Sequence, residues 1–154
     1  MADPTLPITG GCLCGAVRYE ASEPPGTDGT ICHCRICQKG YGNGFAVAAD
    51  FASKAFRFTQ GEPRMYQSSN VGERGFCAVC GSPLIMRYTS LPEKLWVYVG
   101  TLDDPDVAKD SPAMHVGIES EIPWLTIHDD LPRNRCEDVA IYGEVGLVLD
   151  DDAG

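Results

Sequence analysis

The fold is decided by the stretch GGCLCGAVRYE at residues 10–20, where two cysteines flank a leucine and apolar and polar side chains then alternate. Alternation predicts an extended strand, because successive side chains of a strand point to opposite faces. Leu13, Val17 and Tyr19 would face a core, while Cys12 and Cys14 would lie on the other face. The predicted strand, residues 12–20, therefore offers two sulfurs to one side.

Two later stretches carry thiols at similar spacing, ICHCRIC at residues 31–37 and CAVC at residues 77–80. In a CxxC step the chain must turn tightly so that two sulfurs can share one tetrahedral zinc ion. Gly81 follows the last cysteine and suits the positive φ that such a turn often needs. The clustered thiols predict zinc binding, and they are Cys12, Cys14, Cys32, Cys34, Cys37, Cys77 and Cys80.

Seven thiols divide into four and three, which matches one closed structural zinc site and one open site with a vacant ligand position. From spacing alone the closed site could combine Cys12 and Cys14 with either later pair, so the division stays open. A disulfide scaffold is the first alternative, supported by the even total of 8 cysteines. A redox dithiol at Cys77 and Cys80 is the second, but such a motif opens a helix in a βαβ unit, and none is evident.

Composition sets the class of protein. The 154 residues, 44% of them hydrophobic, suit a single domain over residues 1–154. A net charge of −10 argues against a nucleic-acid partner, because such binding depends on Lys and Arg. The sequence has no apolar run long enough to predict a membrane span, and the first residues do not resemble a secretion signal. We therefore expect a cytoplasmic protein whose cysteines stay reduced.

The remaining chain predicts a mainly β fold, because 17 glycines and 11 prolines leave little room for long helices. Residues 35–41 would form one helical turn. Residues 139–149 fit a strand as well as a buried turn, and the acidic end after them would be solvated. Further strands are predicted over residues 30–34, 45–49, 56–59, 64–68, 73–76, 84–88, 95–99 and 115–118.

In their order, spacing and residues, these segments resemble the family of glutathione-dependent formaldehyde-activating enzymes and centromere protein V, called the GFA domain. The resemblance covers about residues 8–133 and leaves residues 136–154 as a C-terminal extension with an acidic end. It rests on GGCLCGAVRYE (10–20), ICHCRICQKGYGNGFAV (31–47), ERGFCAVCGSPL (73–84), WVYVGTLDDP (96–105), His115, IPWLTI (122–127) and LPR (131–133).

The resemblance implies a mostly β architecture called the β-tent, built of short antiparallel strands around two zinc ions. It assigns the structural zinc to four cysteines and the catalytic zinc to the remaining three: Cys12, Cys14, Cys77 and Cys80 for the first, and Cys32, Cys34 and Cys37 for the second. The implied activity is carbon-sulfur lyase chemistry that joins a small thiol such as glutathione to formaldehyde, with the open zinc binding the thiolate. The alternative is a non-enzymatic zinc module that carries a thiol or metal or mediates a protein interaction.

This chain departs from the family pattern at residues 40–44, where Gly-Tyr-Gly-Asn-Gly replaces a small polar run, and this puts the substrate in question. An anionic thiol needs basic groups or N–H donors, so Arg35 and Lys39 are candidates, with solvated surface charge as the plainer interpretation. Tyr98 and Trp124 are candidate cleft residues, although strand aromatics usually belong to the core.

Three residues remain without an assigned role. His33 should face away from the metal that Cys32 and Cys34 hold, if that stretch is extended, and would then be a hydrogen-bonded strand histidine. His115 is as compatible with a satisfied structural histidine as with a proton shuttle. Cys136 lies beyond the resemblance and is expected to be a small buried hydrophobe.

Overall fold

The computed structural model describes residues 4–143. Within this range the regular structure consists of strands β1 to β11, two short α-helices and several single 3-10 turns. The expected mainly β fold class is confirmed. None of the helices in the described part of the chain has the length and apolar character needed to cross a membrane.

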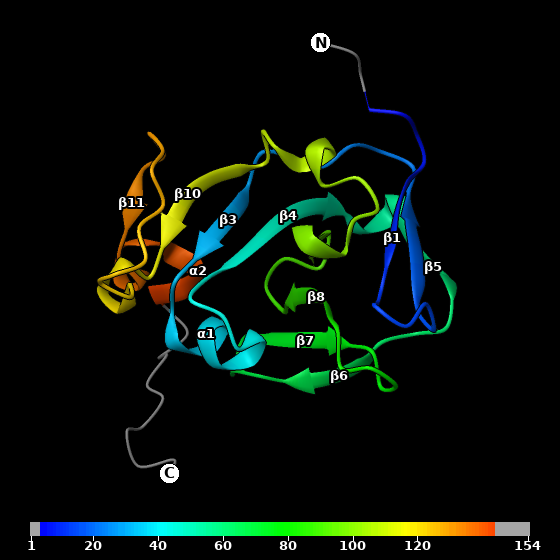
Figure 1. Ribbon diagram of the computed structural model, residues 1–154, viewed down its shortest axis with the longest axis horizontal. Coiled ribbons are helices and arrows are strands. Elements are labelled where there is room, and N and C mark those ends of the chain that lie inside the picture. Colours follow the sequence, from blue (N-terminus) through cyan, green and yellow to red (C-terminus); the bar gives the residue numbers. More distant parts are fainter. Residues whose placement is uncertain (1–3, 144–154) are drawn as a thin grey trace.

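The smaller sheet has three antiparallel strands in the order β1-β2-β5 and lies at the right of Figure 1. Its strands are β1 (Ile8–Gly11), β2 (Arg18–Ala21) and β5 (Phe56–Gln60). Tyr19 is 1% exposed and stacks on Phe56 with ring centroids 5.0 Å apart. Aromatic pairs of this kind add to the stability that area burial already provides.

The larger sheet has eight strands in the order β11-β10-β3-β4-β9-β8-β7-β6. Strand β10 runs parallel to both β3 and β11, and the other neighbours are antiparallel. The bounds are β3 (Gly29–Cys32), β4 (Ala46–Ala52), β6 (Arg64–Gln67), β7 (Gly72–Phe76), β8 (Pro83–Tyr88), β9 (Lys94–Tyr98), β10 (Pro112–Val116) and β11 (Arg133–Asn134).

Helix α1 (Arg35–Tyr41) follows β3 and lies near the start of β7 in Figure 1. Its N-cap is Cys34, whose sulfur accepts a hydrogen bond from the Cys37 backbone N–H, and its C-cap is Gly42 in the left-handed region. Short polar side chains normally occupy N-caps, so a thiol in this place is unusual. Helix α2 (Ala140–Gly143) comes at the end of the described chain.

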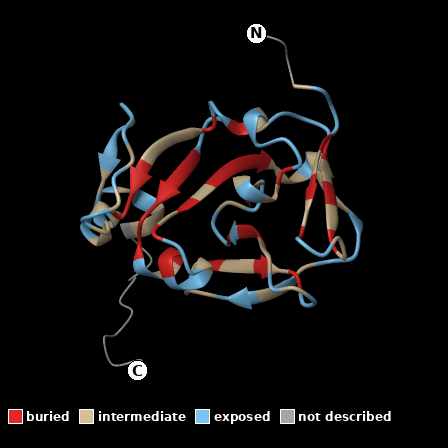
Figure 2. Ribbon diagram, viewed as in Figure 1, coloured by how far each residue is buried: buried red, intermediate tan, exposed pale blue. Residues whose placement is uncertain are grey.

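The larger sheet packs a hydrophobic cluster on each face, because strand residues alternate in direction. In β9, Leu95 and Val97 belong to the cluster that faces the smaller sheet, and Trp96 and Tyr98 belong to the other. Figure 2 shows buried residues along β3, β4 and β10. The first cluster includes Cys12 and Cys77, and the second includes Cys32, Cys34 and Cys37. The two groups of thiols therefore lie on opposite faces of one sheet.

The predicted strand over residues 12–20 is wrong in its first half. Residues 12–17 form a turn, β2 begins only at Arg18, and Leu13 is 90% exposed instead of facing the core. Strands β1 and β11 were not predicted, and the last predicted strand begins three residues earlier than expected, in β10. The other strands and the helix at residues 35–41 are confirmed to within a few residues. Of the segment at residues 139–149, residues 140–143 form a helix, while the acidic end lies outside the described residues.

Candidate metal centres

The first cysteine cluster is made by two turns, one from each sheet. Cys12 and Cys14 lie between β1 and β2, and Cys77 and Cys80 lie between β7 and β8. All four sulfurs lie within 4.8 Å of one another, with Sγ–Sγ distances of 3.6 Å for Cys12–Cys14 and 3.8 Å for Cys14–Cys77. Four sulfurs at about 2.3 Å from one tetrahedral zinc lie ~3.8 Å apart. The donor set and its spacing therefore fit a four-cysteine zinc ion.

Glycine makes both turns possible. Gly15 follows Cys14 with φ 80°, and Gly81 follows Cys80 with φ 77°, as the sequence predicts for Gly81. The second turn closes through a hydrogen bond of 2.8 Å from the Gly81 N–H to the Cys77 carbonyl. Residues with a Cβ avoid this part of backbone space, so the sulfurs depend on glycine for their direction.

Hydrogen-bond donors surround the sulfurs of this cluster. The Val17 N–H donates to Cys12 Sγ over 3.2 Å. The Ser82 hydroxyl accepts from the Leu13 N–H at 3.0 Å and lies 3.2 Å from Cys80 Sγ. The hydrogen bond from Ser82 is the main cause that lowers the pKa of Cys80 to about 5. These donors favour anionic sulfur, which is the form that binds metal.

The second cluster is local in sequence. Cys32 ends β3, Cys34 caps α1, and Cys37 lies in the first turn of that helix. The three sulfurs lie within 4.8 Å of one another, and each residue is buried, with 5 to 6% of its surface exposed. Three protein ligands around a zinc ion leave a fourth position for a substrate. The donor set therefore fits an open site.

Negative charge in this trio is concentrated on Cys34. Hydrogen bonds from Cys32 and then Cys37 lower the pKa of Cys34 to about 3, and the Arg74 guanidinium acts in the same direction. The pKa of Cys32 is raised well above its ordinary value, first by its hydrogen bond to Cys34. One thiolate, on Cys34, with hydrogen bonds from its two neighbours is the expected state of such a group before metal enters.

Arg74, in β7, is a site residue that the sequence did not reveal. Its Nη2 donates to Cys37 Sγ at 3.5 Å, its Nε donates to the Tyr41 hydroxyl at 2.8 Å, and its Nη1 contacts Ser68 Oγ. The guanidinium also lies 5.8 Å from the centre of the Tyr41 ring. Sequence position carries no signal for the contacts with Tyr41 and Cys37, because they join segments 33 and 37 residues apart.

A small cavity adjoins the three buried thiols. Its volume is about 30 Å³, which is room for about one water molecule. Besides the cysteines, its walls include the aromatic side chains of Tyr88, Trp96, Tyr98 and Tyr142. Tyr98 thus lines a cavity, as considered from the sequence, whereas Trp124 is 81% exposed and does not line it.

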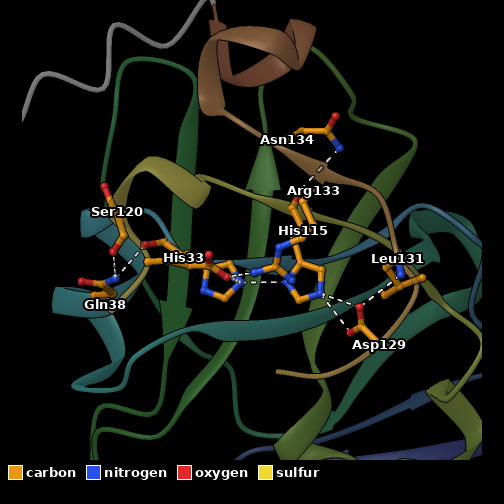
Figure 3. A network of polar contacts seen from close by, with 9 residues as sticks. His33, Gln38, His115, Ser120, Asp129, Leu131, Arg133 and Asn134 are labelled. Carbon is orange, nitrogen blue, oxygen red and sulfur yellow. Dashed lines mark hydrogen bonds and ion pairs between the residues drawn. The ribbon is translucent and has the colours of Figure 1, made fainter. Parts of the chain in front are cut away.

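His33 and His115 are buried and take part in a chain of polar contacts (Figure 3). His33 Nε2 lies 2.8 Å from His115 Nδ1, and His115 Nε2 lies 2.9 Å from a carboxylate oxygen of Asp129. Because a carboxylate only accepts, His115 donates through Nε2 and accepts from His33 through Nδ1. His33 therefore makes its hydrogen bond away from the trio, and His115 is a satisfied buried histidine.

The same two imidazoles and Glu121 bring three ligand atoms within 4.8 Å of one another, a geometry that can also hold a metal ion. Their contacts are satisfied without an ion, because His33 and His115 bond to each other and Glu121 pairs with Arg133. The sequence indicated hydrogen-bonded histidines at His33 and His115, but it gave no pattern that pointed to Asp129 as a partner.

The two basic residues that the sequence offered as candidates have different surroundings. Arg35 is exposed and contacts the side chain of Gln38 in its own helix, whereas Lys39 lines a groove together with Arg74. Cys136 is half-buried against the cluster that contains the trio, consistent with a small hydrophobe. Its sulfur is not among the seven that group closely in the described chain.

Comparison with known proteins identifies the family of this chain. The family described as glutathione-dependent formaldehyde-activating enzyme (GFA) matches residues 7–119. The chain belongs to the GFA family. A protein of Halomonas elongata, provisionally named a glutathione-dependent formaldehyde-activating enzyme, is 27% identical over 136 residues, which are 84% of this chain and 85% of that protein. A crystal structure of a Rhodobacter sphaeroides protein is 29% identical, with a TM-score of 0.54, and covers 68% of this chain and 97% of that one.

All seven clustered cysteines of this GFA protein lie within the matched range, but part of the site's surroundings does not. Asp129, the partner of His115, and Tyr142, in the cavity wall, both follow the last matched residue. The segment at residues 120–143 therefore adds contacts to the site that the family match does not describe.

Proposed function

We propose that this GFA protein is a zinc-dependent carbon-sulfur lyase-like enzyme that acts on the adduct of a small thiol, such as glutathione, with an aldehyde, such as formaldehyde. The observation that carries the proposal is the trio of buried cysteines beside a cavity, within a chain of the GFA family. In the synthetic direction the thiol sulfur bonds to the carbonyl carbon, and the thiol proton ends on the former carbonyl oxygen. The reverse direction breaks the same bond.

Two zinc ions would occupy the clusters, one held by Cys12, Cys14, Cys77 and Cys80, the other by Cys32, Cys34 and Cys37. When bound to the trio, zinc would supply a fourth ligand position and favour the thiolate form of the substrate thiol. The protein's own side chains would position and shelter the substrate. The trio fixes where sulfur is held, Arg74 places a positive charge beside it, and the aromatic walls keep bulk water away.

The size of the cavity supports a small aldehyde. A volume of about 30 Å³, room for about one water molecule, favours a one-carbon aldehyde over a large one. Eight free thiols, none paired in a disulfide among the described residues, fit a reducing compartment such as the cytoplasm.

Exchange NMR on zinc-loaded protein tests the proposal, by measuring the rate at which glutathione and formaldehyde equilibrate with their adduct. We expect acceleration by the wild type and a loss of about 100-fold or more in Cys34→Ser, because the trio can then no longer position the thiol. Cys136→Ser is the matched control and should keep the wild-type rate. Absence of any excess over the uncatalysed rate would exclude this substrate pair.

A further inference from the structure

An open groove lies next to the three-cysteine site. Its volume is about 480 Å³, within the range of roughly 300 to 1,000 Å³ that small-molecule sites occupy. Two positively charged side chains, Lys39 and Arg74, line it, and no aspartate or glutamate does. In a chain with a net charge of −10, a basic surface of this size is a local exception.

The groove lies beside the thiol cavity, because Ile36 and Arg74 line both. The cavity has a volume of about 30 Å³, room for about one water molecule, so only a small part of a thiol substrate can enter it. The rest of a peptide-sized thiol must therefore lie outside the cavity. The groove offers the space beside it.

The contacts of Arg74 leave it able to bind an anion. Its bonds to Cys37, Tyr41 and Ser68 use three N–H groups, and a guanidinium has five. Gly40 lies next to the guanidinium and carries no side chain, and a Cβ at that position would be in van der Waals contact with Arg74, 3.9 Å from its Nε. Guanidinium groups bind carboxylates through charge-assisted hydrogen bonds, which are the strong ones.

Tyr41 belongs to the stretch where this chain departs from the family pattern. Its hydroxyl accepts from Arg74 and contacts the Tyr98 hydroxyl, so it holds the guanidinium between cavity and groove. The altered stretch thus supports the basic groove instead of removing it.

We propose that this groove binds the carboxylate-bearing part of the thiol substrate, with Lys39 and Arg74 as specificity-determining residues. The assignment rests on the proposed function for the identity of the ligand as a thiol. It narrows the substrate to anionic thiols and predicts discrimination against neutral ones.

Isothermal titration of the zinc-loaded protein with S-methylglutathione tests the groove without using the thiol. We expect binding that weakens at high salt, and the dimethyl ester of the same compound should bind about tenfold more weakly, because two carboxylates are neutralised. Lys39→Gln should weaken binding of S-methylglutathione about threefold, the effect expected for one exposed ion pair. It should not change binding of the ester.

Arg35→Gln is the matched control, because it removes the same charge from the same helix outside the groove. It should leave the affinity unchanged. Equal binding of acid and ester, equal effects of the two variants, or no binding at all would overturn the proposal. Catalysis of the glutathione reaction with a KM that does not depend on Lys39 would overturn the groove and keep the enzyme. Lys39-dependent binding without catalysis would overturn the proposed enzyme activity and keep the groove.

Discussion

The neighbours of each sulfur distinguish the two cysteine clusters at the scale of single residues. Around Cys12 and Cys80 the donors are a backbone N–H and a hydroxyl from the turns that carry these cysteines. Beside Cys37 stands the guanidinium of Arg74, with aromatic walls around the cavity. The first set suits sulfur that is permanently bound, whereas the second leaves a charged, sheltered space for a ligand.

Gly81→Ala tests how far the first cluster depends on its turn. Nothing lies within 4 Å of a Cβ at this position, so the only cost comes from its φ of 77°. We expect a loss of about 1 to 2 kcal/mol in the free energy of unfolding, measured by denaturant titration of the zinc-loaded protein. Gly100→Ala is the control, because it also has open space but no positive φ, and it should change stability little. Equal losses would contradict this account.

Single residues were predictable where their direction follows from the local backbone. The positive φ of Gly81 follows from the turn that a CxxC step requires, and the direction of His33 follows from alternation beside two cysteines. Arg74 was not predictable, because strand pairing sets it opposite Met86 and its hydroxyl partner Tyr41 comes from a distant helix. Asp129 was missed for the same reason.

At the scale of elements, the four-cysteine cluster joins the two sheets. One pair of sulfurs comes from the β1–β2 turn of the smaller sheet, and the other from the β7–β8 turn of the larger sheet. Protein contacts at this junction include the Arg18–Asp103 ion pair and a hydrogen bond of 2.7 Å between the hydroxyls of Tyr19 and Thr101. A metal ion at the cluster adds its binding free energy to these contacts.

Cys77→Ser should therefore act on the fold, unlike Cys34→Ser. We expect Cys77→Ser to lower the free energy of unfolding by about 3 kcal/mol or more, because it removes a ligand that connects the sheets. Hydrogen exchange should become faster first in β1 and β2. Cys34→Ser should retain wild-type exchange in those strands. The same exchange pattern in both variants would show that the clusters do not have separate roles.

Sequence pattern located most elements and missed the geometry between them. The strands with alternating or apolar runs, such as β8 and β9, lie where predicted. Alternation at residues 12–14 predicts a strand, but the backbone turns there. The Val17 N–H bonds to Cys12 Sγ and the Gly15 N–H to the Cys12 carbonyl, so these donors need no partner strand. The parallel pairing of β10 with β3 depends on a long connection, for which local pattern carries no signal.

At the scale of the whole molecule, the last described segment contributes side chains beside the three-cysteine cluster. Strand β11 pairs with β10, and the Tyr142 ring in α2 packs at 88° against Tyr88 with ring centroids 5.9 Å apart. Tyr142 also lines the thiol cavity. Residues beyond the family match therefore set the size of the space beside the trio.

Tyr142→Ala should enlarge that space. We expect a loss of about 3 kcal/mol in unfolding free energy, because a large aromatic side chain leaves a packed cluster. If the proposed enzyme activity holds, the ratio of acetaldehyde to formaldehyde turnover should rise about tenfold, since one added carbon then fits. Tyr142→Phe keeps the ring and should stay close to the wild type in both measurements. An unchanged aldehyde ratio in the alanine variant would show that the ring does not limit substrate size.

The separation of the sulfurs along the chain also bears on synthesis at the ribosome. Cys14 and Cys77 are 63 residues apart, so at translation rates of roughly 5 to 20 residues per second the first pair of thiols waits about 3 to 13 s for the second. The local trio is complete within six residues. If zinc binds as proposed, the three-cysteine site of a nascent chain can therefore fill before the four-cysteine site, and zinc starvation during translation would leave Cys12 and Cys14 exposed to oxidants.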